Sequence, residues 1–161
     1  MNIFVTDLDP TLSARDLADR HVVKMILETT QILSTVLRLR GVDDPDLYKI
    51  THASHPSVVW AGASPVNTAW AYRHARDLAE EYTVRYGKIH ACERTLGQIA
   101  RHDPDMAAIS DPPRDFVYVG PAEHWTGDVP TSYRTYLKAK YRTWGDRARW
   151  RSPAQKPAWM E

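Results

Sequence analysis

Residues 13–40 read SARDLADRHVVKMILETTQILSTVLRLR, a long stretch without glycine or proline. Ser13, with Asp16 three residues later, resembles a capping box, and Gly41 supplies a stop signal. The stretch therefore predicts one long helix. At 100° per residue, the expected apolar stripe contains Val22, Val23, Ile26, Thr30, Leu33 and Leu37. The opposite side carries His21, Lys24, Glu28, Gln31 and Thr35.

A second long helix is predicted over residues 64–86, because Ser64-Pro65 is a favourable start and Gly87 fits the position after the last turn. Its core stripe is expected to contain Ala69, Tyr72, Ala75, Ala79, Tyr82 and Tyr86, with Arg73 and Arg85 facing elsewhere. Shorter helices are expected at 89–101 and 131–144, loops at 42–63 and in the proline-rich stretch 103–130, and extended pieces at 2–5 and 116–119. The fold class is mainly α, a compact single-domain helical protein with two long helices and long proline-rich loops.

The composition is that of an ordinary globular protein. Its 161 residues fit one domain, residues 1–161, and 43% of them are hydrophobic. No apolar run approaches the ~18 residues of a membrane span, and no signal-peptide pattern is present. The single cysteine, Cys92, excludes an internal disulfide and a cysteine-rich metal site. We therefore expect a monomer without a membrane partner, in the cytoplasm or, if a phage encodes the chain, in the host cytoplasm.

The first predicted helix also carries the strongest chemical pattern. His21, Lys24 and Glu28 are spaced i, i+3 and i+7, which places them on about one helical face. A carboxylate beside an amine can protonate a sugar oxygen, or it can stabilise a cationic intermediate while the amine attacks. The alternative is a solvent-exposed face whose Lys–Glu pair contributes a few tenths of a kcal/mol.

Other motifs point away from metal and nucleotide chemistry. His52 and His55 form an H-x₂-H pattern without a third ligand nearby in the sequence, so structural or hydrogen-bonding histidines are expected. The sequence has no phosphate-cradling glycine motif and no nucleophile-elbow motif. We expect no metal and no cofactor.

The C-terminal stretch is basic and aromatic, although the whole chain has a net charge of only +1. Between residues 133 and 156 the sequence contains eight basic residues but only one acidic residue, Asp146. Five tyrosines and tryptophans are interleaved with the basic residues. This pattern fits a surface that follows a nucleic-acid backbone and stacks on bases. It fits equally an amphipathic helix with inward tyrosines and solvated arginines.

The stretch Leu17-Ala18-Asp19-Arg20-His21 resembles the bacteriophage-type pyrimidine-dimer DNA glycosylases, the endonuclease V family. In that family a similar stretch opens the first helix, and a catalytic glutamate follows seven residues after the histidine, where this chain has Glu28. The resemblance continues more weakly through residues 67–87 and a C-terminal Pro157-Ala158-Trp159. It implies a compact helical enzyme that binds double-stranded DNA, flips a base, cuts the glycosidic bond and nicks the strand without a metal.

The resemblance also implies the site. Family members use an N-terminal α-amine as nucleophile, which here would be that of Met1, although Asn2 rather than a basic residue follows it and Leu27 replaces an arginine. The nucleophile stays open between Met1, Lys24 and an activated water, and an α-amine ordinarily loses its proton about two pH units below a lysine amine. The expected catalytic residues are Glu28, His21, Lys24 and Met1. The expected DNA contacts are Arg20, Arg73, Arg142, Arg147, Arg149, Arg151, Trp60, Trp70 and Tyr48.

Two other functions remain compatible with these residues. The first is a phage transferase that modifies DNA bases with Glu28 as its base. The second is a DNA-binding protein without catalytic activity. A binding assay combined with a base-release assay separates a glycosylase from a protein that only binds DNA, because binding without base release favours the binding protein.

Overall fold

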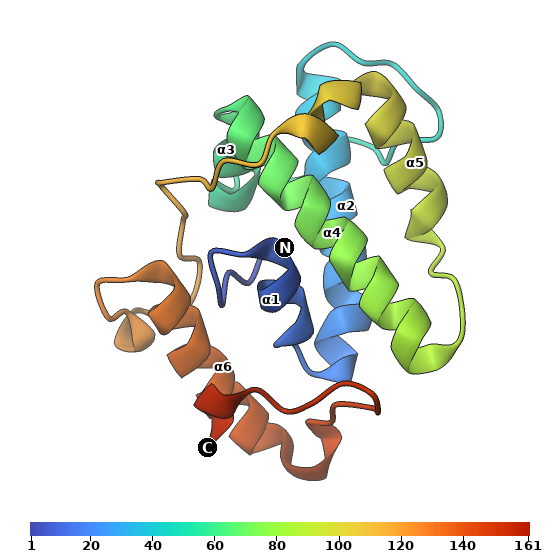
Figure 1. Ribbon diagram of the computed structural model, residues 1–161. Coiled ribbons are helices and arrows are strands. Elements are labelled where there is room, and N and C mark those ends of the chain that lie inside the picture. Colours follow the sequence, from blue (N-terminus) through green and yellow to red (C-terminus); the bar gives the residue numbers. More distant parts are fainter.

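The computed structural model describes residues 1–161 and contains six α-helices and no strand (Figure 1). The α-helices are α1 (Pro10–Arg15), α2 (Asp19–Leu39), α3 (Pro56–Gly62), α4 (Pro65–Tyr86), α5 (Cys92–His102) and α6 (Val129–Trp144). Short 3₁₀ turns occur at Pro104–Ala108, Ala122–His124, Gly145–Arg147 and Ala158–Met160. The predicted mainly α class is therefore confirmed. None of the helices combines the length and the apolar character that a membrane span requires.

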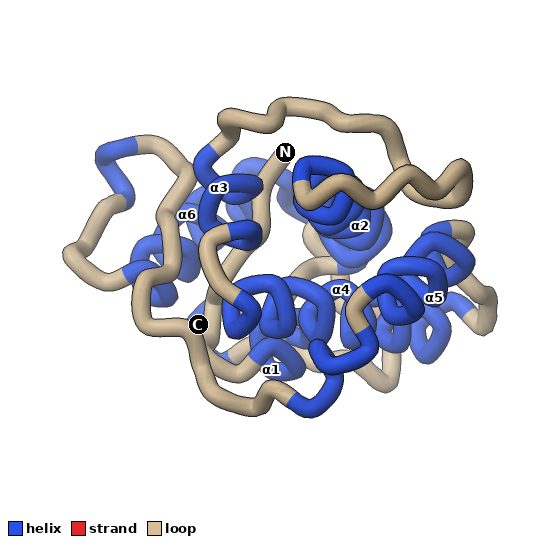
Figure 2. Tube along the Cα trace, turned by 90° about the horizontal axis from the view of Figure 1, so that it is seen from above, coloured by secondary structure: helices blue, strands red, loops and turns tan.

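The two long helices α2 and α4 pack against each other and form the centre of the structure. Helices α1, α3 and α5 surround this pair, whereas α6 and the C-terminal tail lie at one end (Figures 1 and 2). The buried face of α2 includes Val22, Met25, Ile26 and Leu33. Val23, which was expected in this face, is 37% exposed.

The prediction of one continuous helix over residues 13–40 is wrong, because the chain turns between α1 and α2. The side chain of Asp9, not Ser13, caps α1 by accepting from two backbone N–H groups. The buried hydroxyl of Ser13 instead donates to the carbonyl of Phe4. At the turn, the guanidinium of Arg85 donates to the carbonyls of Arg15 and Leu17. Long-range hydrogen bonds thus satisfy the backbone groups that a continuous helix would have paired.

The second long helix agrees with its prediction at both ends. Ser64 caps α4 through Asn67 N, and Gly87 ends it with φ of 64°, a left-handed conformation that favours glycine. Its buried face differs from the expected stripe, since Trp70, His74 and Leu78 are buried whereas the three tyrosines are only half-buried. Arg85, expected to face elsewhere, is buried as well.

The predicted loop at 42–63 and the predicted start of the last helix need correction, whereas the extended pieces expected at 2–5 and 116–119 do lie outside the helices. The expected loop at 42–63 contains α3, which starts at Pro56 after His55 as its cap. The segments 2–5 and 116–119 form no strand, but Ile3, Phe4 and Val5 are buried. Helix α6 starts two residues earlier than expected because Asp128 caps it. Because this N-terminal segment is buried, Met1 at its beginning lies beside α2.

Candidate active site

The carboxylate of Glu28 lies between two amines. The α-amine nitrogen of Met1 is 3.7 Å from Glu28 Oε2, and Lys24 Nζ is 3.1 Å from Glu28 Oε1. Lys24 is exposed, but the Glu28 side chain is only 13% exposed and the Met1 side chain 5%. An ordinary Lys–Glu pair on a solvent-exposed helix face would leave the carboxylate in water. The low exposure of Glu28 and the nearby α-amine therefore differ from such a pair.

The position of Met1 depends on Asn2. The amide nitrogen of Asn2 donates to the carbonyl of Val119 at 2.6 Å, and its amide oxygen accepts from the Tyr133 hydroxyl at 2.8 Å. Burial raises the pKa of the Tyr133 hydroxyl, which therefore stays protonated and remains a donor. Because Ile3, Phe4 and Val5 are also buried, the segment that carries the α-amine is fixed in the structure, with the amine beside Glu28 of α2.

His21 lies beneath α6, not on a solvent-exposed face with Glu28. Its Nδ1 is 2.8 Å from the hydroxyl of Tyr141, and the rings of Phe4 and Trp144 pack against it. Burial lowers its pKa to about 3, and the cations around it, Lys140 first, act in the same direction. The Tyr141 hydroxyl accepts from Ala18 N and so donates to the neutral imidazole. The imidazole of His21 thus connects α2 to α6 through its contacts with Tyr141 and Trp144.

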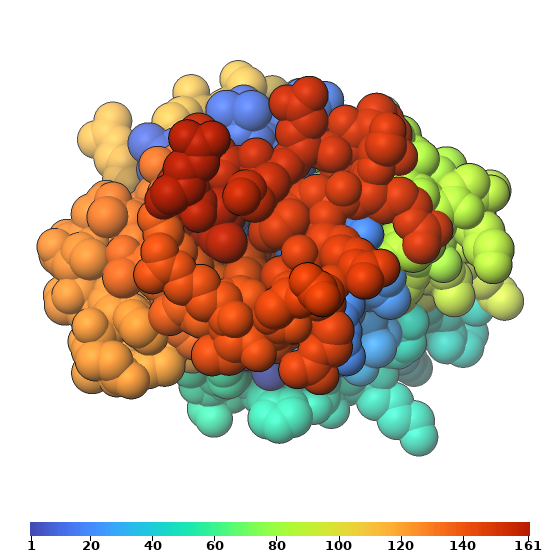
Figure 3. Space-filling view, turned by 90° about the horizontal axis from the view of Figure 1, so that it is seen from below, coloured from blue at the N-terminus to red at the C-terminus, as the bar shows by residue number.

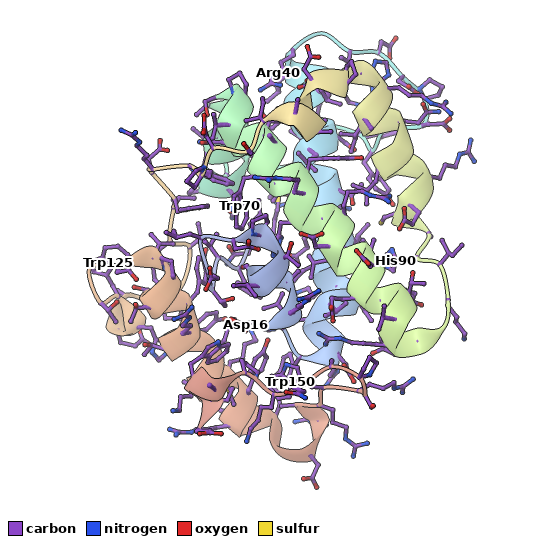
Figure 4. All side chains as sticks on the ribbon, viewed as in Figure 1. Asp16, Arg40, Trp70, His90, Trp125 and Trp150 are labelled. Atoms are coloured by element: carbon purple, nitrogen blue, oxygen red, sulfur yellow. The ribbon has the colours of Figure 1, made fainter.

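Two aromatic residues that were expected to contact DNA belong to the core. Trp70 has no exposed surface, and its Nε1 donates to the carbonyl of Leu8 at 2.7 Å (Figure 4). Trp60 is 6% exposed and stacks on Phe116. A base cannot reach either ring without opening the core, so these two assignments are corrected.

Tyr48 and Arg73 are both half-buried. The hydroxyl of Tyr48 pairs with the thiol of Cys92 at 3.4 Å, and burial together with this thiol raises the pKa of Tyr48 to about 12. The Nε of Arg73 is buried without a hydrogen-bond partner. Tyr48 thus connects the 42–55 loop to α5, and neither residue forms a hydrogen bond or an ion pair with Met1 or Glu28.

The predicted arginines of α6 and the C-terminal tail are exposed, as is Arg20 at the start of α2. The exposed set contains Arg20, Arg142, Arg147, Arg149 and Arg151. Arg20 lies over the ring of Trp144, with 5.3 Å between the guanidinium carbon and the ring centre. Figure 3 shows this face, where α6 and the tail cover most of the surface and the first residues, in dark blue, reach it as a small patch. The basic surface and the start of the chain thus share one face.

Hydrogen bonds attach the tail to the start of α2. The backbone N of Asp19 donates to the Arg149 carbonyl at 2.8 Å, and Asp19 Oδ1 accepts from Arg151 N at 3.0 Å. The indole nitrogen of Trp150 donates to the carbonyl of Asp16, and both residues lie near the tail in Figure 4. The indole nitrogen of Trp159 donates to the Asp16 carboxylate. The same helix that carries Glu28 therefore also anchors the basic tail.

His55, which was expected to be structural, lies at the start of α3, where the charges of Met1 and Glu28 influence its pKa. His55 is half-buried at the start of α3, and its pKa is lowered, by burial first and then by the charge of the Met1 amine, whereas Glu28 raises it. Both charges therefore act on the ring. The H-x₂-H spacing gave a signal for this loop, but only the fold brings His55 to α2.

The site offers little to a metal ion, because no group of three or more histidine, cysteine or acidic side chains is close enough together to hold one. A hollow of about 900 Å³ lies elsewhere, between the 111–116 loop and the starts of α4 and α6. None of the predicted site residues lines it.

A comparison with protein-family models matches residues 1–94, more than half of the chain, to the family described as pyrimidine dimer DNA glycosylase. A search of the curated proteins and a search of the solved structures found no match. The matched stretch contains Met1, Lys24, Glu28 and His55, whereas α6 and the basic tail lie outside it. The chain therefore belongs to the pyrimidine dimer DNA glycosylase family.

Proposed function

We propose that this protein excises a damaged or modified pyrimidine from double-stranded DNA, with the α-amine of Met1 as nucleophile and Glu28 as catalytic carboxylate. Membership of the family supports a DNA glycosylase role. The observation that carries the finer proposal is the 3.7 Å separation between the Met1 amine and the half-buried Glu28 carboxylate. An amine beside a carboxylate is the pair that covalent glycosidic cleavage needs.

The chemistry balances with these groups alone. The neutral amine attacks C1′ of the sugar, and the bond from C1′ to the base breaks with its electron pair on the base. One amine proton goes to the ring oxygen as the sugar opens, and the other ends on the departing base. The carboxylate of Glu28 stabilises the positive charge on the sugar and carries these protons. The resulting Schiff base permits a lyase step that nicks the strand.

Lys24 has a different role in this proposal. Its side chain is 66% exposed, and its ammonium group pairs with the oxygen of Glu28 that does not face Met1. An ammonium group that is held in an ion pair has no free lone pair and is a poor nucleophile. It is well placed to contact a DNA phosphate beside the site.

The DNA backbone is proposed to follow the face formed by α6, the tail and the start of α2. The cations Arg20 and Lys140 flank the ring of Trp144 there, at 5.3 Å and 6.0 Å from its centre. Cations interleaved with an aromatic ring suit a phosphate backbone with an unstacked base. Base flipping would bring the target nucleotide from this face to Glu28.

The direct test compares the protein with a variant that carries two extra residues, Gly-Ser, before Met1. Duplexes with a single cyclobutane pyrimidine dimer, and duplexes with other modified pyrimidines, are assayed for release of the base from C1′. We expect release by the unextended protein and a loss of at least ~100-fold in the extended variant, because its amine no longer lies beside Glu28. Equal rates for both proteins would exclude the α-amine as nucleophile, and an absence of release from every duplex would exclude the glycosylase.

A further inference from the structure

Three hydrogen bonds join the side chain of Asn2, the backbone of Val119 and the hydroxyl of Tyr133 in a closed arrangement, called here the Asn2 clamp. The Asn2 amide nitrogen donates to the Val119 carbonyl at 2.6 Å, Val119 N donates to the Tyr133 hydroxyl at 2.9 Å, and this hydroxyl donates to Asn2 Oδ1 at 2.8 Å. The carbonyl of Val117 lies farther from the hydroxyl, at 3.4 Å. Asn2 Oδ1 also accepts from Ile3 N at 2.8 Å. Each member of the clamp both donates and accepts, so the orientation of the Asn2 amide is set.

Packing fixes Tyr133 itself. Its side chain has no exposed surface, and its ring packs edge-on against Phe4 and Tyr118, with 5.6 Å and 4.9 Å between ring centres. It belongs to α6, the helix that also carries the exposed Arg142. A hydroxyl without access to solvent cannot contact DNA. Any effect of this hydroxyl on the reaction must therefore pass through Asn2 and Val119.

Only one residue separates the clamp from the α-amine of the chain. Successive Cα atoms are about 3.8 Å apart, so a fixed Asn2 restricts where the Met1 amine can lie. That amine is 3.7 Å from Glu28 Oε2. Attack on a sugar carbon depends on such placement, because a displacement of about 1 Å can cost about 100-fold in rate.

We propose that Tyr133 is a positioning residue of the reaction: its hydroxyl holds Asn2, and Asn2 holds the α-amine of Met1 where it attacks C1′. This role rests on the proposed glycosylase function. It gives α6 two tasks, because the helix supplies exposed cations to the proposed DNA surface and a buried hydroxyl to the nucleophile. Both Val119 and Tyr133 lie outside the family match of residues 1–94.

Tyr133→Phe removes the hydroxyl and keeps the packed ring. Helix α6 supplies a matched control in Tyr141, which is buried as well. Its hydroxyl likewise accepts from a backbone N–H, that of Ala18 at 3.2 Å, and pairs with the side chain of His21 at 2.8 Å. Loss of either hydroxyl leaves a backbone N–H without this partner, so the two variants should lose similar stability. Only Tyr133 is joined to Asn2.

Two rates measure the effect: formation of the borohydride-trapped adduct on a duplex with a preformed abasic site, and base release from a duplex with a pyrimidine dimer. We expect Tyr133→Phe to lower both maximal rates about tenfold, because the amine is less well placed. The protein concentration that gives half of the maximal rate should stay within about twofold, since the DNA surface is intact. Tyr141→Phe should leave both rates within about twofold, and urea unfolding compares the stabilities of the two variants.

Combination with Asn2→Leu adds a readout that general structural damage would not produce. Leucine has nearly the shape of asparagine but cannot form the clamp, so Asn2→Leu alone should also slow trapping about tenfold. Adding Tyr133→Phe to Asn2→Leu should then cause little further loss, because the clamp is already broken. Independent effects would instead multiply to about 100-fold.

Three results would overturn the inference: equal losses in Tyr133→Phe and Tyr141→Phe, an unchanged trapping rate in Tyr133→Phe, or multiplied losses in the double variant. Failure of the proposed function is distinguishable from all three. In that case the protein without substitutions would release no base and form no adduct, and the role of Tyr133 would fall with it.

Discussion

Residues 1–94 and residues 95–161 use their charged side chains in opposite ways. In the first region Arg85 is buried, Glu28 is 13% exposed, and an α-amine faces the carboxylate. In the second region Arg142, Arg147, Arg149 and Arg151 are exposed, and the guanidinium groups of Arg147 and Arg149 donate only to backbone carbonyls three residues earlier. Arg134 on α6 is the exception, because it is half-buried and pairs with Asp7. Fixed charges suit bond cleavage, because preorganised groups need no rearrangement during the reaction, whereas accessible cations suit a phosphate backbone. The comparison teaches that reaction rate and DNA affinity should respond to different substitutions.

The largest expected effect belongs to Glu28. Glu28→Gln keeps the shape of the side chain and removes its charge, so we expect base release to fall by at least ~100-fold, the lower end for a lost acid–base group. DNA affinity should change little. A single-turnover base-release assay and a binding titration measure the two effects. Glu80→Gln, an exposed position on α4, serves as the control, and equal turnover in both variants would contradict the site assignment.

A smaller effect is expected where the two regions meet, at His21. Burial lowers its pKa to about 3 from an ordinary 6.5, so the unfolded chain binds the proton more readily than the folded one. The contribution of the neutral ring to stability is complete above about pH 6.5 and is lost as the pH falls towards 3, by up to ~1.4 kcal/mol per pH unit.

His74 is buried, and its pKa is lowered to about 3 by burial as well, so it acts in the same direction. We expect urea unfolding to show a stability that falls from pH 7 to pH 5 and falls less steeply in His21→Gln. A variant with an unchanged pH slope would show that His21 is not held neutral at the contact between α2 and α6.

The smallest effect is expected for single arginines of the tail. Arg149→Ala should lower the slope of log affinity against log salt by about 0.9 if the side chain contacts one phosphate, without changing the rate of base release at saturating protein. Arg101→Ala, exposed on α5, is the matched control. An identical salt slope in both variants would remove Arg149 from the DNA surface.

Local signals predicted much of the fold. The Ser64-Pro65 start and the Gly87 end of α4 are confirmed because capping depends on neighbouring residues only. The break between α1 and α2 could not be predicted, because the groups that satisfy it come from Arg85 and Trp150, far away in the sequence. Periodicity describes a helix face but not which partner covers it, and so His21 was expected on the face opposite the core, although α6 buries it.

The candidate site was predictable only in part. The spacing of Lys24 and Glu28 identified the pair, since helical geometry fixes their distance. The approach of Met1 depends on the contacts of Asn2 with Val119 and Tyr133, which no local pattern encodes. Trp60 and Trp70 were expected at the DNA because tryptophan suits both wet and dry surroundings, and only packing shows that they belong to the core.

The nucleophile is the central claim, and borohydride trapping followed by peptide mapping tests it most directly. The protein is incubated with a duplex that contains an abasic site, reduced and digested, and the peptide that carries the sugar is identified by mass spectrometry. The account predicts that the adduct lies on the α-amine of Met1, next to Glu28, and not on Lys24. An adduct on Lys24, or base release without any trapped adduct, would contradict it.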